Sequence, residues 1–319
     1  MKRLAAALLC LSFVSAPARA DVSVRWLGVA GFTLSSGEAT LAHDPFLSRP
    51  GGMRTLFRAY VPDETVLGRF IGEASPAPEL ARAKLYLVGH SHYDHLGDVP
   101  WLAARTQGRV VGSATTAAIA QGYGLAPDET IVAAPGEVLG EGPFEVRVFA
   151  SRHAKVMFGR VPFEGELSEP PEAPIHASSF VLGDARGYLV TERASGLRVV
   201  LLSSAGFDPA ALTALGQEVG PVDLLLAATH GREPDYASQL VKTLRPRLVV
   251  PHHFDDFSLP IDDPAAAAPQ DEEGLAAFEA ELREAAKAEG VALEVRRAKL
   301  LESWTLGQPA TSAPPGPPI

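Results

Sequence analysis

Three imidazoles and one carboxylate lie within six consecutive residues, in the stretch His90-Ser-His-Tyr-Asp-His95. Imidazole nitrogens and carboxylate oxygens are ligands for zinc, manganese or iron, and no thiolate accompanies them here. The chain of 319 residues has only nine histidines, so a polar loop that is histidine-rich by chance is a poor explanation for this density. We therefore expect a metal site built from His90, His92, Asp94 and His95.

The flanking sequence places this cluster between a strand and a helix. An apolar strand over 85–88 precedes it, and a helix over 98–104, with Asp98 as its N-cap, follows it. Because side chains alternate along an extended chain, His90 and His92 point the same way and can reach one ion. Asp94 and His95 follow where the chain turns, and they can project toward a second metal position beside the first.

The pattern His-x-His-x-Asp-His after a strand resembles the signature of the metallo-β-lactamase superfamily. The likeness covers about residues 22–257. Segments 26–34 and 41–47 resemble the branch that holds the ascorbate phosphate lactonases and the phospholipase D acting on N-acyl phosphatidylethanolamines, and residues 91–96 are closer to that phospholipase D. The resemblance implies a four-layer αββα sandwich, whereas the alternation of strands and helices alone predicts only α/β or α+β.

The resemblance also implies the remaining ligands. His153, directly after an alternating strand, corresponds to the family's third histidine for the first metal. The family's Pro-x-His-aromatic ending aligns with His253, which would join Asp94 and His95 at a second metal. The alternative, in which His252 binds and His253 packs, stays open because neighbouring strand residues face opposite sides.

The family pattern breaks after the strand over 198–202. Relatives carry Gly-Asp-Thr-Gly there, and their Asp bridges two metals, but this chain has Ser203-Ser-Ala-Gly206 with Ser204 in the place of the Asp. A neutral hydroxyl is a weak ligand and puts no negative charge between two cations. We expect one bound zinc ion and a second position that is weak, empty or completed by another group. Asp208 is one substitute, although its place before a helix over 209–215 favours an N-cap.

Two further residues are candidates for supporting or contacting the site. By the resemblance, Asp44 before Pro45 buttresses the metal loop, with a plain turn as the alternative. His230 follows a strand over 222–228, and strand carboxyl ends line the active site in such folds. It would contact substrate or aid proton transfer, and a solvated loop histidine is the alternative.

These residues predict hydrolysis by metal-activated water. Zinc held by His90, His92 and His153 would keep one position open for water and lower the pKa of that water toward about 7. Asp94 would orient the water and carry its proton. No Gly-x-Ser-x-Gly elbow offers a serine nucleophile. We predict an exported metal-dependent hydrolase of an ester or phosphodiester, with a small-molecule or lipid-like substrate. The alternatives are a lactonase-type hydrolase and a protein that binds metal or ligand without turnover because of Ser204.

The first twenty residues predict export. Residues 1–20 have a basic start, an apolar middle and an Ala-Arg-Ala end, which is typical of a secretory signal peptide and indicates a periplasmic or secreted protein. Cleavage after Ala20 removes the only cysteine, Cys10, and three basic residues, which leaves 25 basic against 38 acidic residues and a net charge of −13. Thiol chemistry, disulfides and nucleic-acid binding are therefore excluded, and no transmembrane segment is expected.

The rest of the chain, residues 21–307, is expected to form one hydrolase domain, followed by a disordered tail over 308–319 that is rich in Pro, Ala and Gly. An insertion at about 48–78 interleaves apolar residues with arginines. It would form either a lid over a lipid or phosphate ester or a flap that packs on the sheet. Strands are expected over 22–27, 32–35, 39–42, 85–88, 109–112, 144–149, 177–182, 188–191, 198–202, 222–228 and 247–250, and helices over 98–104, 113–121, 209–215, 234–244 and 272–289.

Overall fold

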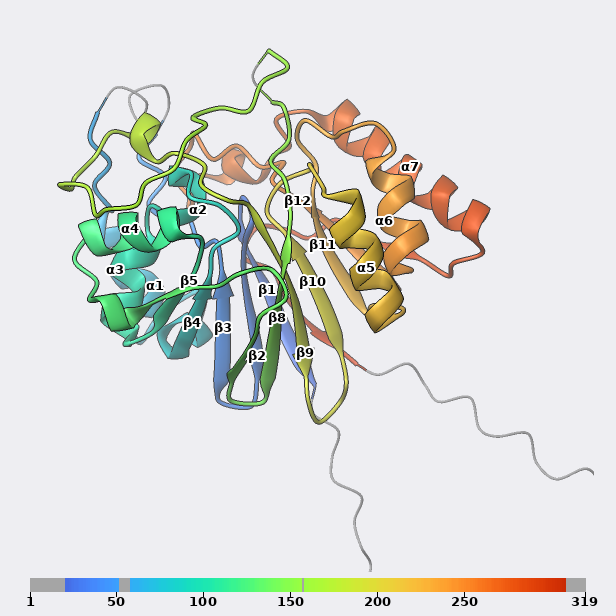
Figure 1. Cartoon of the computed structure of the whole chain (residues 1–319), viewed down its shortest axis with the longest axis horizontal. Helices are drawn as coiled ribbons and strands as arrows, with labels where there is room; N and C mark the ends of the chain where they lie inside the picture. Colours follow the sequence, from blue (N-terminus) through green and yellow to red (C-terminus); the bar gives the residue numbers. More distant parts are fainter. Residues whose placement is uncertain (1–20, 52–57, 157, 308–319) are drawn as a thin grey trace, which may run out of the picture.

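The computed structural model describes residues 21–51, 58–156 and 158–307. Two seven-stranded sheets pack face to face, and helices cover both outer faces (Figure 1). The predicted four-layer αββα sandwich is therefore confirmed. Within these residues, no helix has both the length and the apolar character needed to cross a membrane. The expected signal peptide (1–20) and tail (308–319) lie outside the described residues.

The first sheet has the strand order β14-β1-β2-β3-β4-β5-β6. Its strands are β1 (Val22–Gly28), β2 (Gly31–Ser36), β3 (Ala39–His43), β4 (Ala83–Leu87), β5 (Arg109–Gly112), β6 (Thr130–Val132) and β14 (Ser303–Leu306). The pairs from β14 to β3 are antiparallel, and the pairs from β3 to β6 are parallel.

The second sheet repeats this plan with the order β13-β12-β11-β10-β9-β8-β7. Its strands are β7 (Val138–Glu141), β8 (Phe144–Ala150), β9 (Arg186–Glu192), β10 (Arg198–Leu202), β11 (Leu224–Ala228), β12 (Leu248–His252) and β13 (Glu294–Val295). The pairs from β7 to β10 are antiparallel, and those from β10 to β13 are parallel. The interior strands β10 and β11 are covered on both faces, which explains their continuous apolar sequences.

Helices of the N-terminal and C-terminal halves cover opposite faces of the sandwich (Figure 1). The helices of the first half are α1 (Glu64–Ile71), α2 (Tyr93–Leu96), α3 (Val99–Thr106) and α4 (Ala114–Gly122), and those of the second are α5 (Pro209–Val219), α6 (Tyr236–Leu244) and α7 (Glu272–Glu289). One apolar core lies between the sheets, and one lies under each helical layer. In α7, Leu275, Phe278 and Leu282 are buried at helical spacing, and each contributes about 1.5–3 kcal/mol.

The segment 177–182 does not form the predicted strand. Residues Ala177–Ser179 make a single 3-10 turn, and the chain beyond it is irregular. Phe180 is nevertheless fully buried, with its ring 5.6 Å from the rings of both Tyr60 and Tyr123. The apolar residues of this segment thus fill a loop core and pair with no strand.

The described part of the 48–78 insertion packs on the first sheet. It contains α1, which Asp63 caps by accepting hydrogen bonds from two backbone amides, and Leu67 and Phe70 of that helix are buried. Asp98 stands at the N-cap of α3 but makes no capping hydrogen bond. Its carboxylate instead accepts from the Tyr60 hydroxyl (2.6 Å) and from the backbone amides of residues 47 and 48 (2.6 and 2.7 Å). Asp98 therefore ties the insertion to the chain that follows the histidine cluster.

Candidate metal centre

The candidate ligands follow the carboxyl ends of strands in both sheets. Residues 90–95 follow β4, His153 follows β8 and His253 follows β12. Ser204 and His230 follow β10 and β11. Because β8, β10, β11 and β12 run in the same direction, their carboxyl ends share one edge of the second sheet. The fold thereby gathers side chains that are far apart in the sequence.

The structure brings His90, His92 and His153 together, with one nitrogen of each within 4.8 Å of the others. His92 Nε2 donates to the carbonyl oxygen of Pro162 (3.0 Å), and His153 Nδ1 donates to that of Ala154 (2.6 Å). These bonds fix both rings and leave one nitrogen of each free. Both ring nitrogens of His90 are buried without a hydrogen-bond partner. Three free nitrogens converging in a buried place fit a metal ion.

The surroundings of this first set keep its imidazoles neutral. Burial, followed by the neighbouring imidazoles, holds the pKa of His90 well below its usual value. Burial and the nearby His153 lower the pKa of His92 to about 3, and burial lowers that of His153 to about 4. Neutral imidazole is the form that binds a metal, so the set needs no loss of protons at pH 7.

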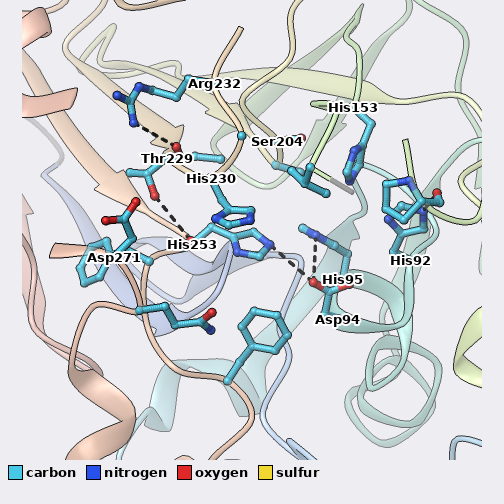
Figure 2. Close-up of a pocket in the computed structure, with 18 of the residues that line it drawn as sticks. His92, Asp94, His95, His153, Ser204, Thr229, His230, Arg232, His253 and Asp271 are labelled. Carbon is cyan, nitrogen blue, oxygen red and sulfur yellow. Dashed lines mark hydrogen bonds and ion pairs between the residues drawn. The ribbon is translucent and has the colours of Figure 1, made fainter. Parts of the chain in front are cut away.

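The structure brings Asp94, His95 and His253 together as a second set, again with one ligand atom of each within 4.8 Å of the others. Asp94 Oδ2 lies 3.5 Å from His253 Nε2 and 3.7 Å from His95 Nε2 (Figure 2). Burial raises the pKa of Asp94, but His95 and His253 outweigh that effect and hold it below the usual value. His253 has a φ of +60°, and its backbone amide donates to the carbonyl of Val29 (2.9 Å), which fixes its turn away from β12.

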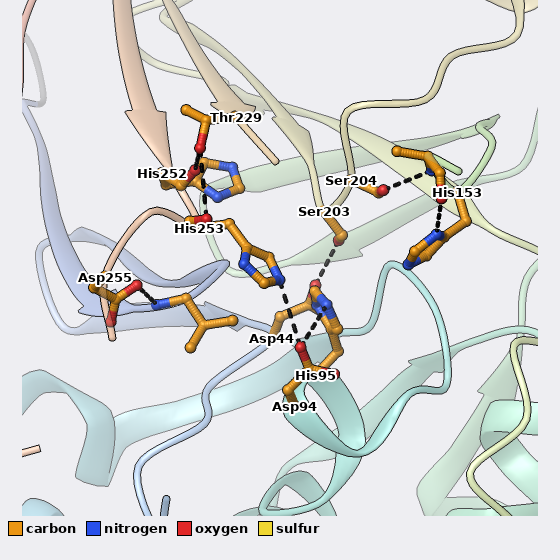
Figure 3. Close-up of polar contacts among 12 residues, drawn as sticks. Asp44, Asp94, His95, His153, Ser203, Ser204, Thr229, His252, His253 and Asp255 are labelled. Atoms are coloured by element: carbon orange, nitrogen blue, oxygen red, sulfur yellow. Dashed lines mark hydrogen bonds and ion pairs between the residues drawn. The ribbon is translucent and has the colours of Figure 1, made fainter. Parts of the chain in front are cut away.

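Asp44 lies behind His95, where the resemblance implied a buttress. Its Oδ2 accepts from His95 Nδ1 (2.8 Å) and from the Ser203 hydroxyl (2.5 Å) (Figure 3). Its Oδ1 accepts from the backbone amide of Gly89 (2.9 Å). These bonds orient the His95 ring and leave its Nε2 free for an ion. At Gly89 a Cβ atom would lie 1.7 Å from Ser203 Oγ, so only glycine fits this approach.

The other predicted residues have separate places. The Ser204 hydroxyl accepts from the backbone amide of Ala154 (2.9 Å) and faces the pocket described below. Asp208 accepts from two backbone amides in the first turn of α5 (both 3.0 Å) and pairs with Arg152, so it is the helix cap and belongs to neither set. His252 is fully buried and packs in the interior, which agrees with the alignment that puts His253 at the metal.

Both sets border one pocket with a volume of about 510 Å³. His230 lies on its wall beyond His253 (Figure 2), and burial followed by the nearby His253 lowers the pKa of His230. None of the described residues of 48–78 lines the pocket. The sequence did not indicate other parts of the wall, among them Lys155, Val156 and Phe163 in the loop after β8, Gln270 and Asp271 before α7, and Leu275 within α7.

The family model described as a beta-lactamase superfamily domain matches residues 23–253 of this chain. The chain belongs to the beta-lactamase superfamily. Among curated proteins, a UPF0173 metal-dependent hydrolase of Cupriavidus taiwanensis is 27% identical over 249 residues, which cover 75% of this chain and 76% of that protein. A UPF0173 metal-dependent hydrolase of Thermococcus onnurineus is 26% identical over 267 residues, which cover 82% of this chain and 95% of that protein.

Solved structures share the fold. The metallo hydrolase Igni18 of Ignicoccus hospitalis has a TM-score of 0.58 at 17% identity and covers 91% of this chain and 100% of its own. The metallo-beta-lactamase fold protein YhfI of Bacillus subtilis has a TM-score of 0.54 at 16% identity, and the match covers 90% of this chain and 100% of YhfI. The predicted superfamily is confirmed, and the branch with the lactonases and the phospholipase D stays a prediction. The family, the relatives' names and the two ligand sets together support a metal-dependent hydrolase.

Proposed function

We propose that this protein is an exported zinc-dependent hydrolase that cleaves an ester or phosphodiester bond. The observation that carries the proposal is the first set, in which three neutral imidazoles offer converging nitrogens beside a pocket. Imidazole donors without thiolate suit zinc. The relatives named metal-dependent hydrolases support the reaction class. The composition of residues 1–20 supports export.

His90, His92 and His153 would hold the first ion, and the second set would hold another. When bound, zinc lowers the pKa of a bound water toward about 7 and polarises the oxygen of the scissile group. The ring orientations needed for this are already fixed, because the carbonyls of residues 154 and 162 and the Asp44 carboxylate each hold one histidine.

Asp94 has the position and the charge to act on the attacking water. Its carboxylate is ionised, borders the pocket and lies next to His95 and His253. It would accept a hydrogen bond from the water, orient it toward the substrate and take up its proton. His230, on the wall beyond His253, would contact the leaving part of the substrate.

The pocket wall favours a substrate with an apolar portion. Val156, Phe163, Phe254, Phe257 and Leu275 supply apolar surface, while Lys155, Gln270 and Asp271 are polar. Such a wall suits an acyl or alkyl group next to a polar scissile bond.

Hydrolysis assays on zinc-replete protein test the proposal. We expect cleavage of p-nitrophenyl esters or of bis(p-nitrophenyl) phosphate, with lactones as the comparison class. His92→Ala should lose the first ion and at least about 100-fold in rate, because removal of a ligand costs more than removal of its outer partner. His176→Ala, which removes an exposed histidine outside the pocket, is the matched control and should keep full activity. Zinc-loaded protein that is inert on the whole panel would refute hydrolysis and favour a binding protein.

A further inference from the structure

The two ligand sets are immediate neighbours. The ring centroids of His90 and His95, which belong to different sets, lie 3.9 Å apart. Members of both sets border the same pocket (Figure 2). Ions held by the two sets would therefore repel each other, and the charge of their ligands matters.

The donors carry too little negative charge for two divalent cations. The sets contain five imidazoles and one carboxylate, that of Asp94. Imidazoles bind metals in the neutral form, so two divalent ions would retain three positive charges after Asp94 is counted. Asp44 contributes a further negative charge, but its carboxylate is enclosed by His95, Gly89 and Ser203 and does not border the pocket.

The remaining charges of the pocket wall do not correct this imbalance. Arg232 pairs with Glu281 at 2.9 Å. Asp271 caps α7 by accepting from the backbone amide of Gly274 (2.8 Å), and Lys155, which also lines the pocket, carries the opposite charge. The excess positive charge at the two sets would thus face the open pocket.

Ser203 and Ser204 link the two sets. The Ser204 hydroxyl accepts from the amide of Ala154, whose carbonyl holds His153 of the first set. Ser203 donates to Asp44, which holds His95 of the second set (Figure 3). Both serines border the pocket, so the side chains at this junction are neutral hydroxyls, and that of Ser204 already accepts a hydrogen bond.

We propose that an oxyanion of the substrate binds beside Ser204 and supplies the negative charge that the two ligand sets lack. Binding of this anion and of the second ion is then cooperative, and the coupling is reciprocal. The inference rests on the proposed function and narrows its substrate class to molecules with a phosphoryl or carboxylate oxyanion next to the scissile bond.

Zinc titration with and without an anion tests this inference. Zinc binding to the purified protein is followed by equilibrium dialysis and elemental analysis, alone and with methylphosphonate or acetate, which represent the phosphoryl and carboxylate sources and are not hydrolysed. We expect the first ion to bind equally well in all three conditions. The affinity for the second ion should rise at least about tenfold with one of the anions, and the more effective anion identifies the source.

Substitutions of Ser204 separate charge from shape. S204D should bind the second ion at least about tenfold more tightly than the wild type without any anion, and the anion effect should disappear. S204N introduces a side chain with nearly the same shape as that of S204D but without its charge. It should bind the second ion as the wild type does. Circular dichroism and thermal melting verify that both variants fold. If S204D does not fold, the titration of the wild type with and without anions decides whether the inference holds.

The inference is overturned if neither anion changes the affinity for the second ion, or if S204D and S204N bind zinc alike. Hydrolytic activity with one or two ions bound but no anion effect would overturn this inference alone. A wild-type protein that binds no zinc would overturn both this inference and the proposed function.

Discussion

Replacing Asp44 with Asn tests how the buried support of His95 controls the second set. Asp44 is completely buried, and its two oxygens accept hydrogen bonds from His95, Gly89 and Ser203. Asn keeps the size but removes the charge, and its amide group has no acceptor among the donors that Asp44 now satisfies. The His95 ring then loses the charged partner that orients its Nε2 toward Asp94.

The expected magnitude follows from the number and kind of these bonds. Loss of a partner behind a metal-binding histidine typically weakens metal binding by about 10–100-fold, which corresponds to about 1.4–2.8 kcal/mol. Hydrogen bonds to charged groups contribute about 1.5–3 kcal/mol each, and Asn retains one acceptor oxygen. We therefore also expect the free energy of unfolding to fall by about 2–4 kcal/mol.

Zinc titration and urea denaturation of Asp44→Asn measure the two effects. The first ion should bind with little change, while the second should bind about 10–100-fold more weakly. Asp208→Asn is the matched control, because Asp208 caps α5 outside the pocket and Asn is an equally good N-cap. If Asp44→Asn holds the second ion as tightly as the wild type, the supporting role of Asp44 is wrong.

Three further predictions concern the metal, the register of β12 and a buried ion pair. Chelation of the zinc should abolish hydrolysis. It should also lower the free energy of unfolding by about 2.7 kcal/mol, compared with protein at a zinc concentration about 100 times the dissociation constant. An unchanged melting temperature after verified zinc removal would contradict this prediction. His253→Ala should lose the second ion with little change in the free energy of unfolding, whereas His252→Ala, at a fully buried position, should lower that free energy by about 2–4 kcal/mol. The opposite pattern in equilibrium dialysis and urea denaturation would show that His252 is the ligand and His253 the packed residue. Asp255→Asn should cost about 3–5 kcal/mol in urea denaturation, because Arg49 and Asp255 form a fully buried pair at 2.6 Å, and a loss below about 1 kcal/mol would argue against that pair.

The sequence predicted the parts of the site that depend on local spacing. The six-residue cluster and the strand before it are adjacent in the chain, so alternation and a turn suffice to supply two of the three ligands of each set. His153 and His253 came only from the family resemblance, because nothing near them in the sequence indicates which distant strand ends they meet. The fold brings both to the cluster because β8 and β12 of the second sheet run in the same direction and end at the same edge.

The features that sequence reasoning missed depend on contacts between distant segments. Asp98 has a suitable position for an N-cap, but chain from the insertion supplies stronger partners for its carboxylate. Phe180 lies in an apolar stretch that resembles a strand, yet aromatic rings from residues 60 and 123 bury it in a loop. The edge strand β14 pairs with β1 across nearly the whole chain, and no local pattern records such a pairing.

The most direct test of the central claim is a crystal structure of zinc-replete protein with anomalous diffraction data at the zinc edge. The proposed function predicts an anomalous peak coordinated by His90, His92 and His153, and a second peak at Asp94, His95 and His253 whose occupancy rises when an oxyanion is present. The absence of any anomalous peak at the three histidines, in protein shown to be folded and saturated with zinc, would contradict the metal centre and the hydrolysis built on it.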